Sequence, residues 1–472
     1  MPREDMPDII VLLPGISGSR LVKDGKVIWG FSASAVMRAL ISGGGAIEKA
    51  LTLADDPLDA DDLGDGVVAD ALIPDLHMIP GLWKIDGYSR IWETLKASFA
   101  VTEGENLFAF PYDWRRDNRV AARRLAKSCH GWLKAWRQKS GNADAKLIFV
   151  AHSMGGLVAR HFIECQEGWK DTRALITFGT PYRGSLNALD TLSNGMKEGP
   201  FGMIDVSRAA RSFTAIYQLL PIYPTYDSGI GPLLRVGEAL DIPNVDPVRA
   251  AQALAFHHEI TDAAEANAKL AEYEASGFRT IPFVGVFQTT NQSARLRNGK
   301  VELVTSHAGK DRGGDGTVPR VSAEPIGHVA GSSSAFFATR HGSLQNADAA
   351  LVNLRGLINS FYLDLGPFKG ARETPPDEVV QVDLDVPDLA TSAEDVHVTA
   401  RPSNPDVTLQ VSIAPAAGGA ATSLPMVPAQ DGSFFAILPK LAAGDYSLSI
   451  DSESHKVERA ADSLAVIDLD AP

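Results

Sequence analysis

A serine near the middle of the chain occupies a sequence typical of a sharp strand-to-helix turn. The apolar run 146–150 leads into Ala151-His152-Ser153-Met154-Gly155, which fits the pattern small-x-Ser-x-Gly. Small residues are needed there because strand and helix approach closely and the serine is held in a strained backbone conformation. The pattern predicts a nucleophile, Ser153, with the N–H of Met154 aimed at a forming oxyanion. An ordinary strand-to-helix junction is the alternative that these five residues leave open.

A nucleophilic serine needs a base that removes its proton and an acid that orients the base. In folds with such a turn the chain order is serine, acid, histidine. The glycine-flanked turn 313–319 contains one carboxylate, so Asp315 is the predicted acid. Taken alone, that segment is more simply explained as a solvated Asp-Gly turn. His341, which ends the apolar run from residue 336, is the predicted base, and His328 is the alternative.

The oxyanion of a tetrahedral intermediate needs two hydrogen-bond donors already in place, an effect worth several kcal/mol. The apolar run 8–13 predicts a buried strand, which continues into Pro14-Gly-Ile-Ser-Gly-Ser19. Glycines allow this loop to approach a ligand, so the second donor, besides Met154, is assigned to the N–H of Ile16. A phosphate-binding loop is disfavoured because no Lys-Ser or Lys-Thr pair follows the glycines.

No metal and no cofactor are predicted. His257 and His258 fall in a helical stretch without a third ligand at a suitable spacing. His307 precedes Asp315 and breaks the expected order. His152 is expected to point away from the serine as a packed structural histidine.

Ordered segments of the chain resemble the lecithin:cholesterol acyltransferase-like branch of the α/β-hydrolases, which includes lysosomal phospholipase A2 and the phospholipid:diacylglycerol acyltransferases. The most specific is Phe110-Pro-Tyr-Asp-Trp-Arg115, which is close to the Tyr-Asp-Trp-Arg signature of that branch. The others, in order, are segments 14–19, 79–88, 177–185 and 314–319. The agreement in order extends from about residue 8 to residue 360.

The resemblance implies an α/β-hydrolase catalytic domain over residues 1–371, with a helical cap inserted at 185–279. Segment 213–221 resembles the cap helix of the family, although core packing explains its apolar spacing as well. A covered apolar pocket is expected beneath the cap. Support of the oxyanion loop and pocket is expected from Trp83, Tyr112, Asp113, Trp114 and Arg115. The lid disulfide of the family is missing, because the chain has only two cysteines.

The composition and the residue pattern of the chain change after Pro375-Pro376. Short segments alternate apolar and polar residues between Gly, Pro, Asn and Asp turns, which predicts an immunoglobulin-like β-sandwich over residues 377–472. This segment carries sixteen acidic and four basic residues, so it holds most of the net charge of −14. It is expected to be an independent unit whose protein partner is unknown; the alternative is that it packs against the hydrolase.

Composition favours a cytoplasmic enzyme; peripheral contact at a membrane surface stays open, although the negative charge disfavours electrostatic capture by anionic membranes. No apolar run approaches the roughly 20 residues of a membrane span, and segment 1–7 lacks the apolar centre of a signal peptide. The negative charge disfavours nucleic acids as partners.

The expected activity is that of a serine-dependent lipase, phospholipase or O-acyltransferase. Its substrates would be lipid carboxyl esters, either phospholipid or acylglycerol, and the reaction would pass through an acyl-enzyme. Two alternatives stay open: an esterase or thioesterase for small soluble substrates, and an effector protein that binds a partner through the sandwich.

Overall fold

The computed structural model describes residues 3–30, 45–74, 77–79, 82–198, 204–326, 334–362, 380–416, 418–452, 457 and 460–468. Its centre is a six-stranded sheet in which every neighbouring pair is parallel. From one edge to the other the strands are β16 (Ala335–Phe337), β13 (Arg279–Gly285), β9 (Thr172–Phe178), β8 (Leu147–His152), β1 (Ile9–Leu13) and β7 (Leu107–Ala109). All carboxyl ends therefore meet at one edge, where loops can converge.

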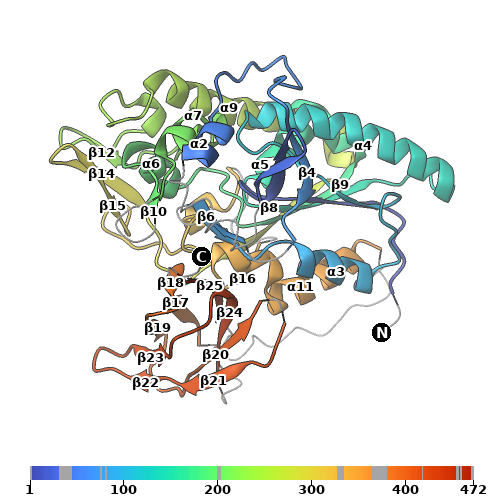
Figure 1. The fold of residues 1–472 in the computed structure, drawn as a ribbon. Helices are drawn as coiled ribbons and strands as arrows, with labels where there is room; N and C mark the ends of the chain where they lie inside the picture. Colours follow the sequence, from blue (N-terminus) through green and yellow to red (C-terminus); the bar gives the residue numbers. More distant parts are fainter. Residues whose placement is uncertain are drawn as a thin grey trace.

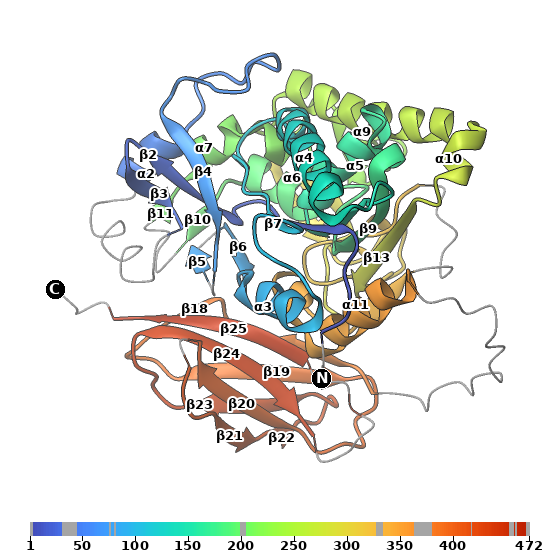
Figure 2. The ribbon, with the colours of Figure 1, turned by 90° about the vertical axis from the view of Figure 1, so that its right-hand side faces the viewer.

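Helices cover both faces of this sheet (Figures 1 and 2). Helices α4 (Asn118–Ser140) and α5 (Gly155–Cys165) lie on one face, and α3 (Ser89–Ser98) and α11 (Asp348–Ser360) on the other. Because all of β1 is buried, its alternate side chains enter two separate apolar cores, one beneath each helical layer. The predicted α/β-hydrolase fold is confirmed.

The chain between β9 and β13 contains a mixture of helices and short strands. The helices are α6 (Leu186–Ser193), α7 (Ser207–Ser212), α8 (Thr214–Tyr217), η3 (Val236–Glu238), α9 (Pro247–Asn267) and α10 (Ala271–Ala275), and the strands are β10 (Lys197–Glu198), β11 (Ile204–Asp205) and β12 (Tyr226–Asp227). The apolar segment 213–221 forms only the single turn α8 and not one longer helix. Its Phe213 packs edge-on against Trp114, at 5.6 Å between ring centroids, so this apolar side chain belongs to the protein core.

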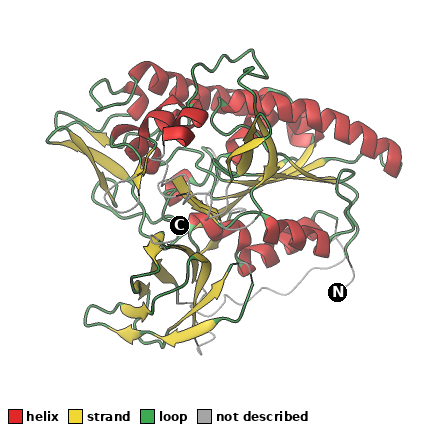
Figure 3. Cartoon of the chain, in the orientation of Figure 1, coloured by secondary structure: helices red, strands yellow, loops and turns green. Residues whose placement is uncertain are grey.

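Smaller elements surround the central sheet, as the distribution of helices and strands in Figure 3 shows. They are β2 (Ser19–Lys23), β3 (Lys26–Trp29) and β4 (Val67–Leu72) in one sheet, β5 (His77–Ile79) with β6 (Leu82–Ile85), β14 (Ser293–Arg297) and β15 (Lys300–Val304) with β12, and α2 (Gly45–Leu51), η1 (Gly168–Asp171), η4 (Arg320–Ser322) and η5 (His341–Asn346). Within the described part of the chain, no helix combines the length and apolar character needed to cross a membrane.

The C-terminal strands form two sheets that enclose their own apolar core. One sheet has the order β17-β19-β23-β22 and the other β18-β25-β24-β20-β21. The strands are β17 (Val382–Asp385), β18 (Leu389–Thr391), β19 (Val396–Pro402), β20 (Gln410–Pro415), β21 (Thr422–Pro425), β22 (Val427–Pro428), β23 (Phe434–Leu438), β24 (Gly444–Asp451) and β25 (Ala460–Ile467). The predicted β-sandwich is confirmed. It packs directly against the hydrolase, below the central sheet in Figure 2.

Candidate active site

Ser153 lies in the turn between β8 and α5 and has a positive φ of 51°. A non-glycine residue in this region is strained, and the surrounding packing maintains the strain. Added Cβ atoms would lie 2.4 Å from the Pro14 carbonyl oxygen at Gly155 and 2.1 Å from the Thr180 hydroxyl at Gly156. The glycines after the serine are therefore required by the close approach of neighbouring loops.

Three side chains from the carboxyl edge of the sheet form a hydrogen-bonded row. The Ser153 Oγ lies 2.9 Å from His341 Nε2, and the His341 Nδ1 lies 2.7 Å from Asp315 Oδ2. All three residues are buried. Because the carboxylate only accepts, the imidazole Nδ1 carries the proton and Nε2 is left to accept from the serine hydroxyl. The arrangement is that of a nucleophile, a base and an orienting acid.

The loop of Asp315 is organised around the carboxylate. Its Oδ1 accepts hydrogen bonds from the backbone N–H groups of Thr317 at 2.9 Å and Val318 at 2.6 Å. The His341 N–H donates to the Asp315 carbonyl oxygen at 2.8 Å, so the two loops are joined through their backbones as well. The alternative base, His328, lies outside the described residues.

The predicted oxyanion loop lies directly against Ser153. A Cβ atom added to Gly15 would lie only 2.8 Å from the Ser153 Cβ. The adjacent Ile16 and Met154 are buried, and within the described residues neither backbone N–H has a hydrogen-bond partner. The two donors predicted for an oxyanion hole are therefore not taken up by another described group of the protein.

Tyr88 and His152 connect this loop to the loop of His341. The sequence analysis missed this connection. The Gly15 N–H donates to the Tyr88 hydroxyl at 2.8 Å, and that hydroxyl lies 2.9 Å from His152 Nδ1. The His152 Nε2 lies 3.1 Å from the carbonyl oxygen of His341. Burial, and secondarily the nearby His341, lowers the pKa of His152 to about 3, so this imidazole is neutral and donates from Nε2.

Gly179 is a second residue that sequence reasoning did not single out. It has a φ of +60°, and a Cβ added there would lie 2.8 Å from His341 Nδ1 and 2.9 Å from Asp315 Oδ2. Only glycine therefore leaves room for the side chains of Asp315 and His341 to meet. Segment 177–185 contributed to the family resemblance, but no local pattern indicates which residues this glycine faces.

Tyr112 and Trp114 donate hydrogen bonds to the two ends of the predicted oxyanion loop, residues 14–19. The Tyr112 hydroxyl donates to the Pro14 carbonyl oxygen at 2.9 Å, and the Trp114 Nε1–H donates to the Ser19 carbonyl oxygen at 3.0 Å. These contacts are what a supporting role requires.

The neighbouring Asp113 and Arg115 form a largely buried ion pair, with 2.6 Å between Oδ2 and the guanidinium. Asp65 approaches the same guanidinium at 3.2 Å.

Of the five predicted support residues, Trp83 falls in β6, and its side chain lies outside the described part of the structure.

A group of potential metal ligands, which the sequence analysis did not identify, lies between α5 and α9. Ligand atoms of His161, Cys165 and Glu259 fall within 4.8 Å of one another. The Glu259 carboxylate already pairs with His161 at 3.0 Å and with Arg119 at 2.7 Å. These contacts explain the group as a link between the two helices.

Cavities in the described part of the structure include two that are not lined by Ser153. One of about 670 Å³ is lined by polar residues that include Asp117, Gln218 and Arg249. Another of about 330 Å³ lies at the junction with the sandwich, beside Asp86 and Asp462. The covered apolar pocket expected next to the nucleophile stays a prediction.

Comparison with known proteins gives a match to the family described as lecithin:cholesterol acyltransferase over residues 82–235. The human protein named lysosomal phospholipase A and acyltransferase is 30% identical over 153 residues, which are 31% of this chain and 36% of the relative. The rat protein of the same name is 30% identical over 134 residues, or 27% of this chain and 31% of the relative. The chain thus spans about a third of the length of the curated relatives that it matches.

Among solved structures, the Bacillus licheniformis lipase BlEst2 in its propeptide form is 10% identical, with a TM-score of 0.33, over 98% of this chain and 94% of that chain. The family match and the curated relatives confirm the resemblance to the lecithin:cholesterol acyltransferase-like branch.

Proposed function

We propose that this chain, which resembles the lecithin:cholesterol acyltransferase-like branch of the α/β-hydrolases, is a serine-dependent enzyme that transfers acyl groups from lipid carboxyl esters. The observation that carries the proposal is the row from Ser153 Oγ through His341 to Asp315, with distances of 2.9 and 2.7 Å. Near the row lie the backbone N–H groups of Ile16 and Met154, for which the described residues provide no hydrogen-bond partner. Such a site suits acyl transfer, because it supplies a nucleophile and stabilises a developing oxyanion.

In the first half of the reaction, Ser153 Oγ bonds to the acyl carbon while its proton moves to His341 Nε2. The carbonyl electron pair moves onto oxygen, where the N–H groups of Ile16 and Met154 donate to it. Collapse of this intermediate breaks the ester C–O bond, and the proton on Nε2 passes to the leaving alcohol. Asp315 holds the imidazole in the required tautomer and stabilises it when charged.

In the second half, water or an acceptor alcohol attacks the acyl-enzyme. Its proton moves to His341 Nε2 and then returns to Ser153 Oγ as the acyl–serine bond breaks. Water gives a free fatty acid, whereas an alcohol gives a new ester. The same residues serve both outcomes, so the supply of acceptor at the site decides between hydrolysis and transfer.

A lipid substrate is supported by the family match and by the names of the curated relatives, which include both phospholipase and acyltransferase activity. We infer a phospholipid or an acylglycerol as acyl donor. The net charge of −14 favours zwitterionic or neutral lipid surfaces over anionic ones.

The test uses purified protein and phosphatidylcholine vesicles, with and without a long-chain alcohol, and measures released fatty acid and new ester. Wild type should release fatty acid and Ser153→Ala should not. Ser140→Ala removes an exposed hydroxyl that donates to the Trp136 carbonyl oxygen and accepts from the Asn142 N–H at the end of α4, and it serves as the matched control. Turnover of short soluble esters without turnover of vesicles would favour the small-ester alternative. If a fluorophosphonate probe failed to label the wild type, this would contradict a serine enzyme.

A further inference from the structure

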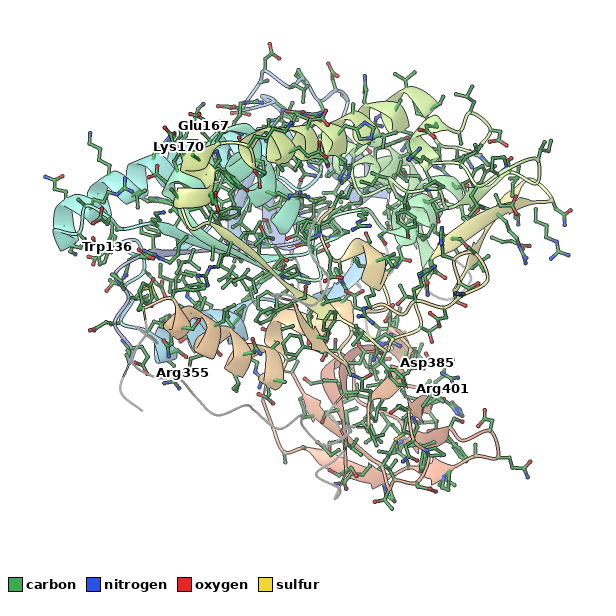
Figure 4. All side chains as sticks on the ribbon, turned by 180° about the vertical axis from the view of Figure 1, so that it is seen from behind. Trp136, Glu167, Lys170, Arg355, Asp385 and Arg401 are labelled. Carbon is green, nitrogen blue, oxygen red and sulfur yellow. The ribbon has the colours of Figure 1, made fainter. Side chains whose placement is uncertain are left out.

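The sandwich contacts the hydrolase through the edge strand β17, next to the loops of the predicted acid and base. Figure 4 labels Asp385, at the end of β17, on the side of the sandwich that faces the hydrolase. This strand pairs on only one side within its own sheet. Its other side has backbone N–H and C=O groups that need partners from elsewhere.

Gln288 supplies two of these partners. Its side-chain Nε2 donates to the Val382 carbonyl oxygen at 3.2 Å, and its Oε1 accepts from the Leu384 N–H at 3.4 Å. The side chain is buried, with only 3% exposed. One carboxamide thus takes the place of a neighbouring strand along this part of β17.

The backbone of Gln288 pairs at the same time with the loop of Asp315. It forms an isolated parallel bridge with Asp315, in which the Gln288 N–H donates to the Gly314 carbonyl oxygen at 3.0 Å. A shift of Gln288 would therefore move the backbone from which the Asp315 carboxylate extends.

Arg340 makes the corresponding contact from the base loop, because it directly precedes His341 in the chain. Its guanidinium donates to the Leu384 carbonyl oxygen and lies 3.3 Å from the buried Asp462 carboxylate of β25. The Asp385 carboxylate approaches the same group at 4.0 Å. The Asp462 carboxylate is buried whereas the Arg340 side chain is partly exposed, so this ion pair ties the guanidinium to the sandwich side of the junction.

The two contacts meet at one residue, Leu384. Its N–H is bound by Gln288 and its C=O by Arg340. We propose that β17 braces the site, so that Gln288 and Arg340 are positioning residues that hold the Asp315 and His341 loops at the correct separation. The proposal rests on the proposed function. It gives the appended sandwich a role in acyl transfer, in contrast to the expectation of an independent unit.

This role predicts a loss in turnover and not in substrate binding, since a misplacement of about 1 Å can cost about 100-fold in rate. Gln288→Met keeps the length of the side chain but removes both hydrogen bonds to β17. We expect it to lower kcat about 10- to 100-fold on a soluble nitrophenyl ester, with KM within twofold. Gln288→Glu keeps the oxygen acceptor for the Leu384 N–H and should recover part of the loss.

The second variant combines Arg340→Met with Asp462→Asn, so that no buried charge is left unpaired. It should lower kcat by a similar factor. Combined with Gln288→Met it should cost less than the product of the separate losses, because both changes release the same strand. The matched control is Thr289→Val, which removes a hydrogen bond of 2.9 Å to Asp383 across the same junction without touching either loop. It should keep kcat within twofold.

A readout independent of activity separates this proposal from the proposed function. Amide hydrogen exchange of the full chain should be faster in segments 313–319 and 340–346 of Gln288→Met, but not of Thr289→Val. If folded Gln288→Met showed unchanged exchange and unchanged kcat, the proposal that β17 positions these loops would be overturned. An equal loss in Thr289→Val would also overturn it, since the effect would then be general to the junction. Absence of esterase activity in wild type, with exchange altered as expected, would count against the proposed function alone.

Discussion

The Tyr88 hydroxyl lies 2.9 Å from His152 Nδ1, within a chain of hydrogen bonds that starts at the Gly15 N–H and ends at the carbonyl oxygen of His341. This pair of buried side chains joins the loop expected to bind the oxyanion to the loop that holds the base. Neither side chain contacts the nucleophile in this chain of bonds, yet each reaches a loop that must be in place for the reaction.

Tyr88→Phe should lower kcat about 10-fold and the free energy of unfolding by about 1–3 kcal/mol, because the Gly15 N–H and His152 Nδ1 lose a partner in a buried site. Ester turnover and urea unfolding measure the two effects. Tyr446→Phe, which removes a hydroxyl bonded to Ala442 within the exposed part of the sandwich, is the control and should leave both unchanged. Full activity in Tyr88→Phe would exclude a positioning role.

Ser153→Ala and His341→Ala should each lower turnover by several orders of magnitude, and both together by little more, because the three residues act as a unit. Asp315→Asn should be severe but less complete. Steady-state kinetics on a soluble ester provides the measurement. If His341→Ala kept full activity and His328→Ala lost it, the base would be His328.

Gly179→Ala should lower kcat by at least about 100-fold, because the new methyl group would separate His341 from Asp315. Gly277→Ala is the matched control. Gly277 has a similar φ of +67°, but no atom of the described residues lies within 4 Å of an added Cβ, so its replacement carries the backbone strain without the clash. Equal losses of activity in the two variants would show that strain, and not the contact with the acid and base, is responsible.

Stability should fall with acid below neutral pH. Burial lowers the pKa of His152 to about 3 and that of His257 to about 4, whereas an ordinary histidine titrates near 6.5. The unfolded chain therefore gains protons between pH 6.5 and 4 that the folded chain does not, and this favours unfolding. At pH 5 each buried histidine should cost about 2 kcal/mol, at roughly 1.4 kcal/mol per pH unit.

Urea unfolding at pH 7 and pH 5 measures this effect. His257→Gln keeps a donor for the Gln218 carbonyl oxygen and should reduce the difference between the two pH values. His397→Gln, at an exposed position in the sandwich, should not. Equal pH dependence in the two variants would contradict the assignment.

Activity should survive strong chelators, because in the proposed reaction Ser153, His341 and Asp315 supply the nucleophile, base and acid without a metal. The group of His161, Cys165 and Glu259 links α5 to α9 through pairs already formed, so chelation should not change the melting temperature either. Assays with and without EDTA, followed by added zinc or calcium, check both statements. A requirement for either ion would show that this group, or another, binds a metal needed by the enzyme.

The residues that the sequence alone identified share a local physical cause. Ser153 was found from the small residues that a strained turn requires, and Asp315 and His341 from their order and from the turns around them. The turns depend on neighbours within a few positions, and the order of serine, acid and histidine can be read along the chain, so both can be recognised before the fold is known. The structure then brought all three within hydrogen-bonding distance.

Only the tertiary structure decided which distant residues support them. Tyr88 meets His152 across 64 positions, and Gln288 meets Leu384 across 96. Such pairs follow from how helices, loops and an edge strand pack against one another, and no periodicity in the chain encodes that packing. The composition break near Pro375-Pro376 indicated a second unit. Whether that unit stands apart or contacts the loops of Asp315 and His341 depends on the edge of β17 that no other strand of its sheet covers. This edge exists only once the sheets of the sandwich have formed.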